Sequence, residues 1–404
     1  MTSGLVFAEW QRTDARPAHH GEPLSTFLDR VAQPLFARVR DLINDWVGEL
    51  ASDSQADVVA RLRSPIDPVF RAAFWELYVY VLLRRCGFGV TVHPAVRDTA
   101  KVPDFEAVRD ALRFYVEASA VGTPEDDQST DARRGRVYDE LNETRSPDFF
   151  LWVDINADGP TDVSMKPLRA ELEAWLQTLD ADQVLDEIAS SGAADRTPRL
   201  NWEQDGWRLS IGAYPKSPSA RDTEEMRPVG IYGSAEAQMI DDRAPLLRRM
   251  KRKANRYGAL DAPFVLAISG STFTTDEQDL ISALFGSEQI TVLTPNGGGD
   301  PIVRPSRADD GLWIRHGQPK HAQVSGVLFV PFIEPWEVAH KVPVLVRHPV
   351  ADLPLDLECP HLRTCRVDDS GGLAWTGPSE PIHQLLGLPP DWPGPEDAFV
   401  PGSY

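Results

Sequence analysis

The stretch that most limits the fold is a long helical pattern followed by three short strand-like runs. Apolar side chains recur at helical spacing through residues 68–86, and Gly87 marks the end of the pattern. The runs 89–93, 103–109 and 113–121 are rich in β-branched and aromatic residues and are separated by turn-like segments. This order predicts one helix followed by three antiparallel strands.

The pattern continues as alternating helices and strands. A helix is predicted over residues 131–143 and a buried strand over 148–154, which gives the order helix, three strands, helix, strand. Farther along, the sequence predicts helices at 166–180, 182–191, 233–257 and 274–286, and strands at 206–215 and 263–269. After residue 295 the chain becomes rich in Pro, Gly and Trp, with short strand-like pieces.

Two carboxylates interrupt the second and third apolar runs. Asp104 and Glu117 are 13 residues apart with a turn between them, so antiparallel pairing brings both side chains to one face. Two close carboxylates repel each other unless a cation lies between them. Mg²⁺ typically takes one or two carboxylates and can stabilise an in-line displacement at phosphorus. A third acid, Glu76 on the preceding helix, is placed to complete the metal shell or to orient a water.

Each acid taken alone also has a purely structural explanation. Asp104 follows Pro103 and is suited to capping the end of a strand, and Glu117 is suited to pairing with an arginine. The joint occurrence of Glu76, Asp104 and Glu117 on helix, strand and strand is what favours a metal site.

The segment 68–155 resembles the core of the PD-(D/E)xK, or restriction-endonuclease-like, nuclease superfamily. The resemblance rests on the order of elements, on Pro103-Asp104 and on Glu117, with Glu76 as the acid of the helix. It implies an α/β fold with an α-β-β-β-α-β mixed sheet, large α/β insertions and a loop-rich C-terminal region. It also implies hydrolysis of DNA or RNA phosphodiester bonds, with Mg²⁺ or Mn²⁺ bound by Asp104 and Glu117. A role in bacterial defence follows from the fold-level resemblance alone.

One residue departs from the superfamily motif. The motif ends in a lysine two positions after the second acid, and this chain has Ser119 there. Because that lysine normally positions and activates water, either catalysis is lost or another cation replaces it. We expect Lys253 to be the replacement; Lys251, Lys101 and Arg134 are the other candidates. The alternative is a catalytically inactive nuclease fold that acts as a nucleic-acid- or protein-binding subunit.

The stretch RRMKRKANR, residues 248–256, holds six basic residues and no acid. In a chain with a formal net charge of −20 it is the clearest basic patch, and it predicts contacts with nucleic-acid phosphates. The structural alternative is a solvated helix end, where cations favour the C-terminal dipole. The predicted nucleic-acid-binding residues are Arg248, Arg249, Lys251, Arg252, Arg256 and Arg134.

Composition limits the class of protein, its location and its partners. A net charge of −20 excludes a protein that coats nucleic acid by charge alone, but it permits an enzyme with a local basic surface. The sequence has no apolar run long enough for a membrane span, no secretory signal, and three cysteines, too few for a disulfide framework. We therefore expect a cytoplasmic protein with nucleic acid as its partner and no membrane. Whether the protein forms a homo-oligomer or acts with an operon partner stays open.

Four regions are predicted along the chain. An N-terminal arm and helix span residues 1–60, the nuclease-like core spans 61–160, and an α/β extension with the basic helix spans 161–290. The Pro-, Gly- and Trp-rich region 291–404 is predicted to be loop-rich. If the protein is an interaction module rather than an enzyme, this last region is the expected working surface.

Overall fold

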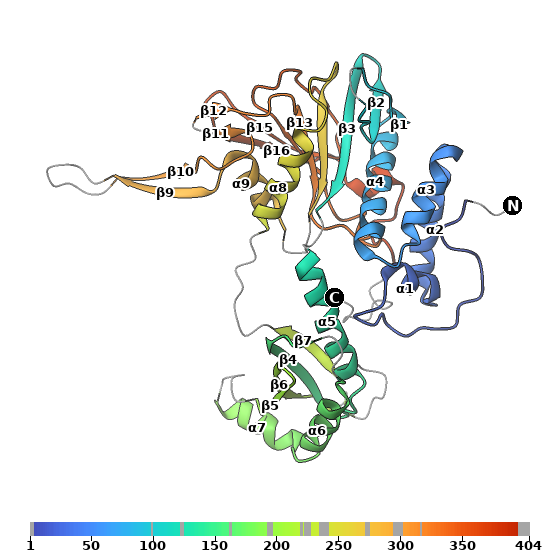
Figure 1. Ribbon diagram of the computed structural model, residues 1–404, viewed down its shortest axis with the longest axis vertical. Coiled ribbons are helices and arrows are strands. Elements are labelled where there is room, and N and C mark those ends of the chain that lie inside the picture. The colour runs from blue at the N-terminus through green and yellow to red at the C-terminus, as the bar shows by residue number, and fades with distance from the viewer. Residues whose placement is uncertain are drawn as a thin grey trace. The chain divides into compact units, whose positions relative to one another are not determined.

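The computed structural model describes most of the chain. The described residues are 4–97, 100–121, 125–160, 164–191, 197–218, 221, 228–233, 242–270, 275–293, 302–315 and 317–394. The chain divides into two compact units (Figure 1). Unit 1 comprises residues 1–15, 23–123 and 241–399, and unit 2 comprises residues 16–22, 124–240 and 400–404. In the described part, no helix is both long and apolar enough to cross a bilayer.

Unit 1 is built around a large mixed sheet in the order β1-β2-β3-β8-β13-β14-β15-β16. Strands β1, β2 and β3 form an antiparallel meander, and β3, β8 and β13 run parallel to one another. The other neighbours pair antiparallel, except that β15 runs parallel to β14. The strands are β1 (Gly89–Val92), β2 (Phe105–Arg109), β3 (Leu112–Ala120), β8 (Phe264–Ser269), β13 (Gly326–Val330), β14 (Val344–Arg347), β15 (Arg363–Val367) and β16 (Leu373–Thr376).

Helices cover both faces of this sheet. Helix α4 (Asp67–Arg85) lies on one side of β3, and α8 (Arg243–Ala254) and α9 (Glu277–Phe285) lie on the other (Figure 1). The Trp75 indole N–H of α4 donates to the Ala267 carbonyl of β8 at 3.0 Å. The apolar positions that predicted α4 are all buried: Phe70, Phe74, Leu77, Tyr78 and Val81. The predicted helix and its packing residues are therefore confirmed.

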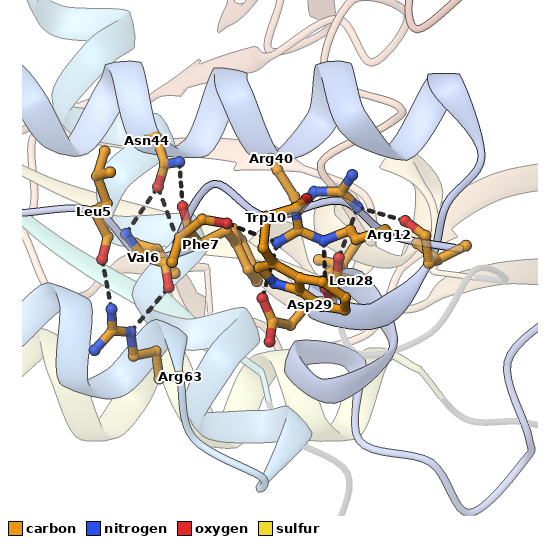
Figure 2. A network of polar contacts seen from close by, with 12 residues as sticks. Leu5, Val6, Phe7, Trp10, Arg12, Leu28, Asp29, Arg40, Asn44 and Arg63 are labelled. Carbon is orange, nitrogen blue, oxygen red and sulfur yellow. Dashed lines mark hydrogen bonds and ion pairs between the residues drawn. The ribbon is translucent and has the colours of Figure 1, made fainter. Parts of the chain in front are cut away.

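Three further helices, α1 (Leu24–Arg30), α2 (Pro34–Gly48) and α3 (Ser52–Leu62), belong to unit 1, and they hold the N-terminal segment. Asn44 of α2 accepts the backbone N–H groups of Val6 and Phe7 at 2.8 and 3.1 Å. Arg63, just after α3, donates to the carbonyls of Leu5 and Val6 at 2.7 and 2.9 Å (Figure 2). Residues 5–7 of the predicted N-terminal arm thus pack on these helices.

Short elements complete unit 1. A two-stranded ribbon, β9 with β10, extends away from the sheet (Figure 1), and a short hairpin, β11 with β12, follows it in the chain. Their bounds, with the C-terminal helix, are β9 (Glu288–Leu293), β10 (Ile302–Arg307), β11 (Ile314–Arg315), β12 (Gln318–Pro319) and α10 (Ile382–Leu386).

Unit 2 has a smaller sheet, in the order β5-β6-β4-β7, with a separate apolar core formed with its helices. The central strands β4 and β6 pair antiparallel, with Leu151 opposite Ala213. The elements are α5 (Glu125–Asn142), β4 (Phe149–Ala157), α6 (Lys166–Leu176), α7 (Ala181–Ser191), β5 (Arg199–Gln204), β6 (Trp207–Pro215) and β7 (Val229–Gly233).

The placement of the predicted fourth strand was wrong. The run 148–154 forms part of β4 in the sheet of unit 2, whereas β8 takes the place beside β3 in unit 1. Both runs are apolar, and sequence pattern alone does not say which distant strand will pair with β3. Parallel pairing needs a crossover connection, which α8 supplies immediately before β8. The order α4, β1, β2, β3, α8, β8 therefore has unit 2 inserted between β3 and α8.

The predicted regions are redistributed accordingly. The segment predicted as a core over residues 61–160 contributes α5 and β4 to unit 2, and the predicted extension 161–290 is shared between both units. The C-terminal region supplies β13 to β16 to the large sheet, although the chain between these strands consists largely of loops. Of the predicted long helix 233–257, residues 234–241 lie outside the described residues, and α8 accounts for 243–254.

Candidate active site

Asp104 and Glu117 face each other across the β2–β3 hairpin. Phe105 pairs with Val116, so the residue before β2 lies opposite Glu117. The Asp104 Oδ2 atom accepts the backbone N–H of Ala118 at 2.8 Å. The hairpin therefore brings together the two acids that the sequence singled out.

Glu117 is fully buried and surrounded by donors from α8 and the turn after it. Its Oε1 atom lies 2.7 Å from Arg256 Nη1 and also accepts a hydrogen bond from Lys253 Nζ. Its Oε2 atom contacts the Tyr257 hydroxyl, which also lies 3.0 Å from the Val102 carbonyl. A buried carboxylate costs several kcal/mol unless it is paired, and two cations from one helix end provide that pairing here.

The spacing of residues on β3 and α8 explains this alignment. Glu117 and Ser119 are two residues apart on a strand, so their side chains point to the same face. Arg249, Lys253 and Arg256 are spaced by four and three residues and so share one side of the helical path. Arg249 donates to the Ser119 hydroxyl while Lys253 bonds to Glu117. Lys253, the predicted replacement for the motif lysine, thus reaches the second acid from 136 residues away.

Asp104 has an electrostatic environment unlike that of an ordinary surface carboxyl. Burial raises its pKa to about 7, and the charges of Glu117 and Glu76 act in the same direction. The Ala118 N–H and the Lys253 ammonium oppose that rise. Ionisation of this carboxyl is therefore less favourable than that of a surface aspartate.

Glu76 lies on α4 and takes part in a separate ion pair. Its Oε2 atom lies 2.6 Å from Arg61 Nη2, and the Arg61 guanidinium also bonds to Asp57 at 2.9 Å. Glu76 is close enough to Asp104 to raise its pKa. The helix acid therefore acts on the site through its charge, with Arg61 holding its side chain.

The acids give a partial fit to a metal site. Mg²⁺ takes one or two carboxylates and completes its shell with water and phosphate, and Asp104 with Glu117 supplies that number. Within the described residues, however, no three His, Cys, Asp or Glu side chains are grouped as a metal-binding cluster. Because the Glu117 oxygens are already bonded to Lys253, Arg256 and Tyr257, a metal ion would have to share Glu117 with these groups or displace one of them.

The predicted basic residues lie in three different environments. Arg249, Lys253 and Arg256 face β3, as described above, whereas Arg248 and Arg252 are exposed on α8. Arg134 belongs to unit 2, where its guanidinium forms a two-point contact with Asp158 at 2.6 and 2.7 Å. Arg134 therefore belongs to a different unit from Asp104 and Glu117.

Sequence reasoning missed a second group of cations, in and just after the β11–β12 hairpin. The pKa of His321 is lowered by burial and by the charges of Lys251, Arg315 and Lys320, so these three side chains lie near His321. Gln323 Nε2 donates to the Ala254 carbonyl at 3.1 Å and fixes this segment to the end of α8. Arg315 and Lys320 are exposed. Isolated cations more than 60 residues beyond α8 give no local signal in the sequence.

Comparisons with protein-family models, curated proteins and solved structures find no match to this chain. The function is therefore argued from the site itself.

Proposed function

We propose that this protein is a Mg²⁺- or Mn²⁺-dependent nuclease that hydrolyses phosphodiester bonds in DNA or RNA. In this proposal α4, β1, β2, β3, α8 and β8 form a restriction-endonuclease-like core, and unit 2 is an insertion between its third strand and second helix. The order of these elements and the parallel pairing of β8 with β3 support that assignment.

The observation that carries the proposal is the bond between Lys253 and Glu117. The superfamily motif requires two acids and a lysine, and the lysine is missing from β3. Lys253 restores the third member from α8, with its ammonium on the acid that faces Asp104. In this role Asp104 and Glu117 bind the metal, Lys253 orients and activates the attacking water, and Glu76 supports the charge of the site.

The surface around α8 is suited to a phosphate backbone. Exposed Arg248 and Arg252 lie on the helix, and Lys251 gathers with Arg315 and Lys320 of the neighbouring segment. A local cluster of this kind attracts nucleic acid even in a protein of net charge −20.

A second candidate function is a nuclease-fold subunit that binds nucleic acid without cleaving it. The observation that favours it is the occupancy of Glu117, whose oxygens are bonded to Lys253, Arg256 and Tyr257 in a fully buried position. If those contacts persist in the presence of metal, they occupy three of the roughly four lone-pair sites of the carboxylate and leave little of it for the ion. The basic surface would then remain as the working part.

The two candidates are separated by one set of assays. The purified full-length protein is incubated with single- and double-stranded DNA and RNA, with Mg²⁺, Mn²⁺ or a chelator, and binding is measured in parallel. The variants are Asp104→Asn and Lys253→Met, and the matched control is Lys166→Met at an exposed lysine of α6. The nuclease predicts metal-dependent cleavage that both site variants abolish and the control retains. Binding without cleavage under every condition contradicts the nuclease and supports the second candidate.

A further inference from the structure

A cavity of about 250 Å³ opens at the carboxyl ends of β3 and β8. It is lined by Ala120 and Val121 next to Ser119, by the first two turns of α4, and by Arg249 of α8. The carboxyl ends of parallel strands are where ligands commonly bind in α/β sheets. The volume is below the roughly 300–1,000 Å³ of most small-molecule sites, so the cavity suits a phosphate group better than a whole nucleotide.

Two guanidinium groups line this cavity, and their charges are balanced differently. Arg71 is fixed by Glu334 at 2.8 Å, lies 3.8 Å from Asp67, and stacks at 5.1 Å on Phe332. Its positive charge is therefore offset by neighbouring acids, and its orientation is set. These two acids are the negative groups that a phosphate would meet beside Arg71.

No acid of the described residues is bonded to Arg249. In the described part of the chain its hydrogen bond goes to the neutral Ser119 hydroxyl, which leaves its positive charge available. Ser119 stands where the motif lysine would be, and its small side chain leaves room for the arginine. The presence of Ser119 instead of the motif lysine is therefore what allows Arg249 to lie at the cavity.

We propose that this cavity is a phosphate subsite, in which Arg249 binds a phosphate group of a nucleic-acid strand and Arg71 serves as a second, pre-oriented donor. The inference rests on the proposed nuclease function for its substrate class, because the cavity adjoins Ser119 on the same face of β3 as Glu117. A guanidinium suits this task because its fork of N–H donors matches two phosphate oxygens.

The test measures binding and does not depend on cleavage. Inorganic phosphate is titrated into the wild-type protein and into Arg249→Met, Arg249→Lys and the control Arg84→Met, an exposed arginine near the end of α4, all in chelator. Affinity should fall about ten-fold or more in Arg249→Met, fall less in Arg249→Lys, and stay unchanged in the control. Absence of phosphate binding by the wild type, or equal binding by Arg249→Met, overturns the subsite.

A second arm identifies which phosphate occupies the subsite. Oligonucleotides with 5′-phosphate, 3′-phosphate or hydroxyl ends are compared by fluorescence anisotropy with the same variants. A preference for one phosphorylated end that is lost in Arg249→Met assigns a terminal phosphate. Equal loss for all three oligonucleotides assigns a backbone phosphate. If the wild-type protein binds phosphate but cleaves no nucleic acid, the nuclease proposal is contradicted and the phosphate-subsite proposal is retained.

A different observation concerns the sulfur atoms of Cys86 and Cys359, which lie 3.1 Å apart. Cys86 follows the end of α4, and Cys359 lies in the loop before β15, 273 residues along the chain. Arg109 donates to the carbonyls of Cys86 and Glu358 at 2.6 and 3.4 Å, so one side chain holds both backbones. Forming a disulfide requires the sulfurs to approach by about 1 Å.

The two thiols also differ in character. The contact with Cys86 lowers the pKa of Cys359, with help from His361 and Arg109, whereas the same contact and burial raise the pKa of Cys86. Cys359 is therefore the thiol that becomes a thiolate first, and the thiolate is the reactive form.

We propose that Cys86 and Cys359 form a reversible intramolecular disulfide when the protein meets a peroxide. The Cys359 thiolate attacks the O–O bond of hydrogen peroxide and becomes a sulfenic acid, and one water is released. The Cys86 thiol then attacks that sulfur, the S–O bond breaks, and a second water leaves. Two thiols have lost two electrons in total, and the peroxide has accepted them. The bond ties the end of α4 to the loop before β15.

Mass mapping and thiol counting test the disulfide on the folded full-length chain. Peroxide should lower the free thiols from three to one, and a non-reducing digest should contain a Cys86–Cys359 cross-linked peptide that dithiothreitol removes. Cys365→Ala, at a separate buried thiol on β15, should keep the cross-link, and Cys86→Ser should lose it. Three remaining thiols, or a cross-link through Cys365 instead, would refute the assignment.

Discussion

Replacing Asp104 by Asn should make the metal-free protein more stable at alkaline pH and remove one component of its pH dependence. The Asp104 carboxyl is buried near Glu117 and Glu76, which raises its pKa from 3.8 to about 7. An asparagine side chain has no charge to desolvate, and its oxygen can still accept the Ala118 N–H that bonds to Asp104 at 2.8 Å. The substitution therefore imitates the protonated carboxyl.

The sign follows from proton binding. Between pH 4 and pH 7 the folded protein holds a proton on Asp104 that the unfolded chain has released, so stability falls as the pH rises. The contribution of this carboxyl is complete below its unfolded pKa and is lost as the pH passes its folded pKa. Between pH 5 and pH 8 the stabilising contribution of Asp104 falls over the roughly two pH units up to its folded pKa. This fall corresponds to about 2–3 kcal/mol of unfolding free energy.

Urea unfolding in the presence of chelator, followed by tryptophan fluorescence, measures this difference. The wild type and Asp104→Asn are compared at pH 5 and pH 8, so that the titrating groups that are not coupled to Asp104 cancel in the double difference. Relative to the wild type, the variant should gain about 2–3 kcal/mol between the two pH values. Parallel pH profiles for the two proteins would show that Asp104 ionises normally, and the account of the site given above would then fail.

Three other substitutions test separate parts of the structure. Lys253→Met should abolish cleavage and destabilise unit 1 by about 1–3 kcal/mol in urea unfolding, because it removes a charged partner of buried Glu117 while Arg256 remains. Lys320→Glu should weaken nucleic-acid binding and reduce the slope of log affinity against log salt by about 1 or more in anisotropy titrations. An unchanged slope would show that the nucleic-acid backbone does not contact Lys320. Arg134→Met should leave cleavage unchanged and cost less than about 1 kcal/mol, since its ion pair in unit 2 is partly exposed.

Local patterns in the sequence were enough to predict the elements that carry the acids. The apolar spacing of α4 and the alternation along β3 depend on residues a few positions apart, and the β2–β3 hairpin is a short-range pairing. Asp104 and Glu117 could therefore be placed opposite each other without a structure. The basic residues of α8 were equally visible as a run of like charge.

The sequence did not show which strands pair when they are far apart along the chain. Both 148–154 and 263–269 are apolar runs fit for a buried strand, and only the fold shows that β8 pairs with β3 while β4 belongs to unit 2. For the missing lysine the sequence favoured Lys253 and left Lys251, Lys101 and Arg134 as other candidates. The contact of Lys253 with Glu117 depends on where α8 lies against β3, which follows from the packing of Leu246, Met250 and Ala254 into the core.

The charges at the site indicate that metal and nucleic acid should bind together rather than in sequence. Ionised Asp104 and Glu117 carry two negative charges, and Lys253 and Arg256 already balance them. A divalent ion added to this neutral set leaves an excess of positive charge in a buried place, which is costly, and the Lys253 ammonium competes for the same oxygen of Glu117. A phosphodiester group supplies the negative charge that offsets the excess. Calorimetric titration of Mn²⁺ should therefore show weak binding to the free protein and much tighter binding when an uncleavable oligonucleotide is present; equal affinity in both states would contradict this coupling.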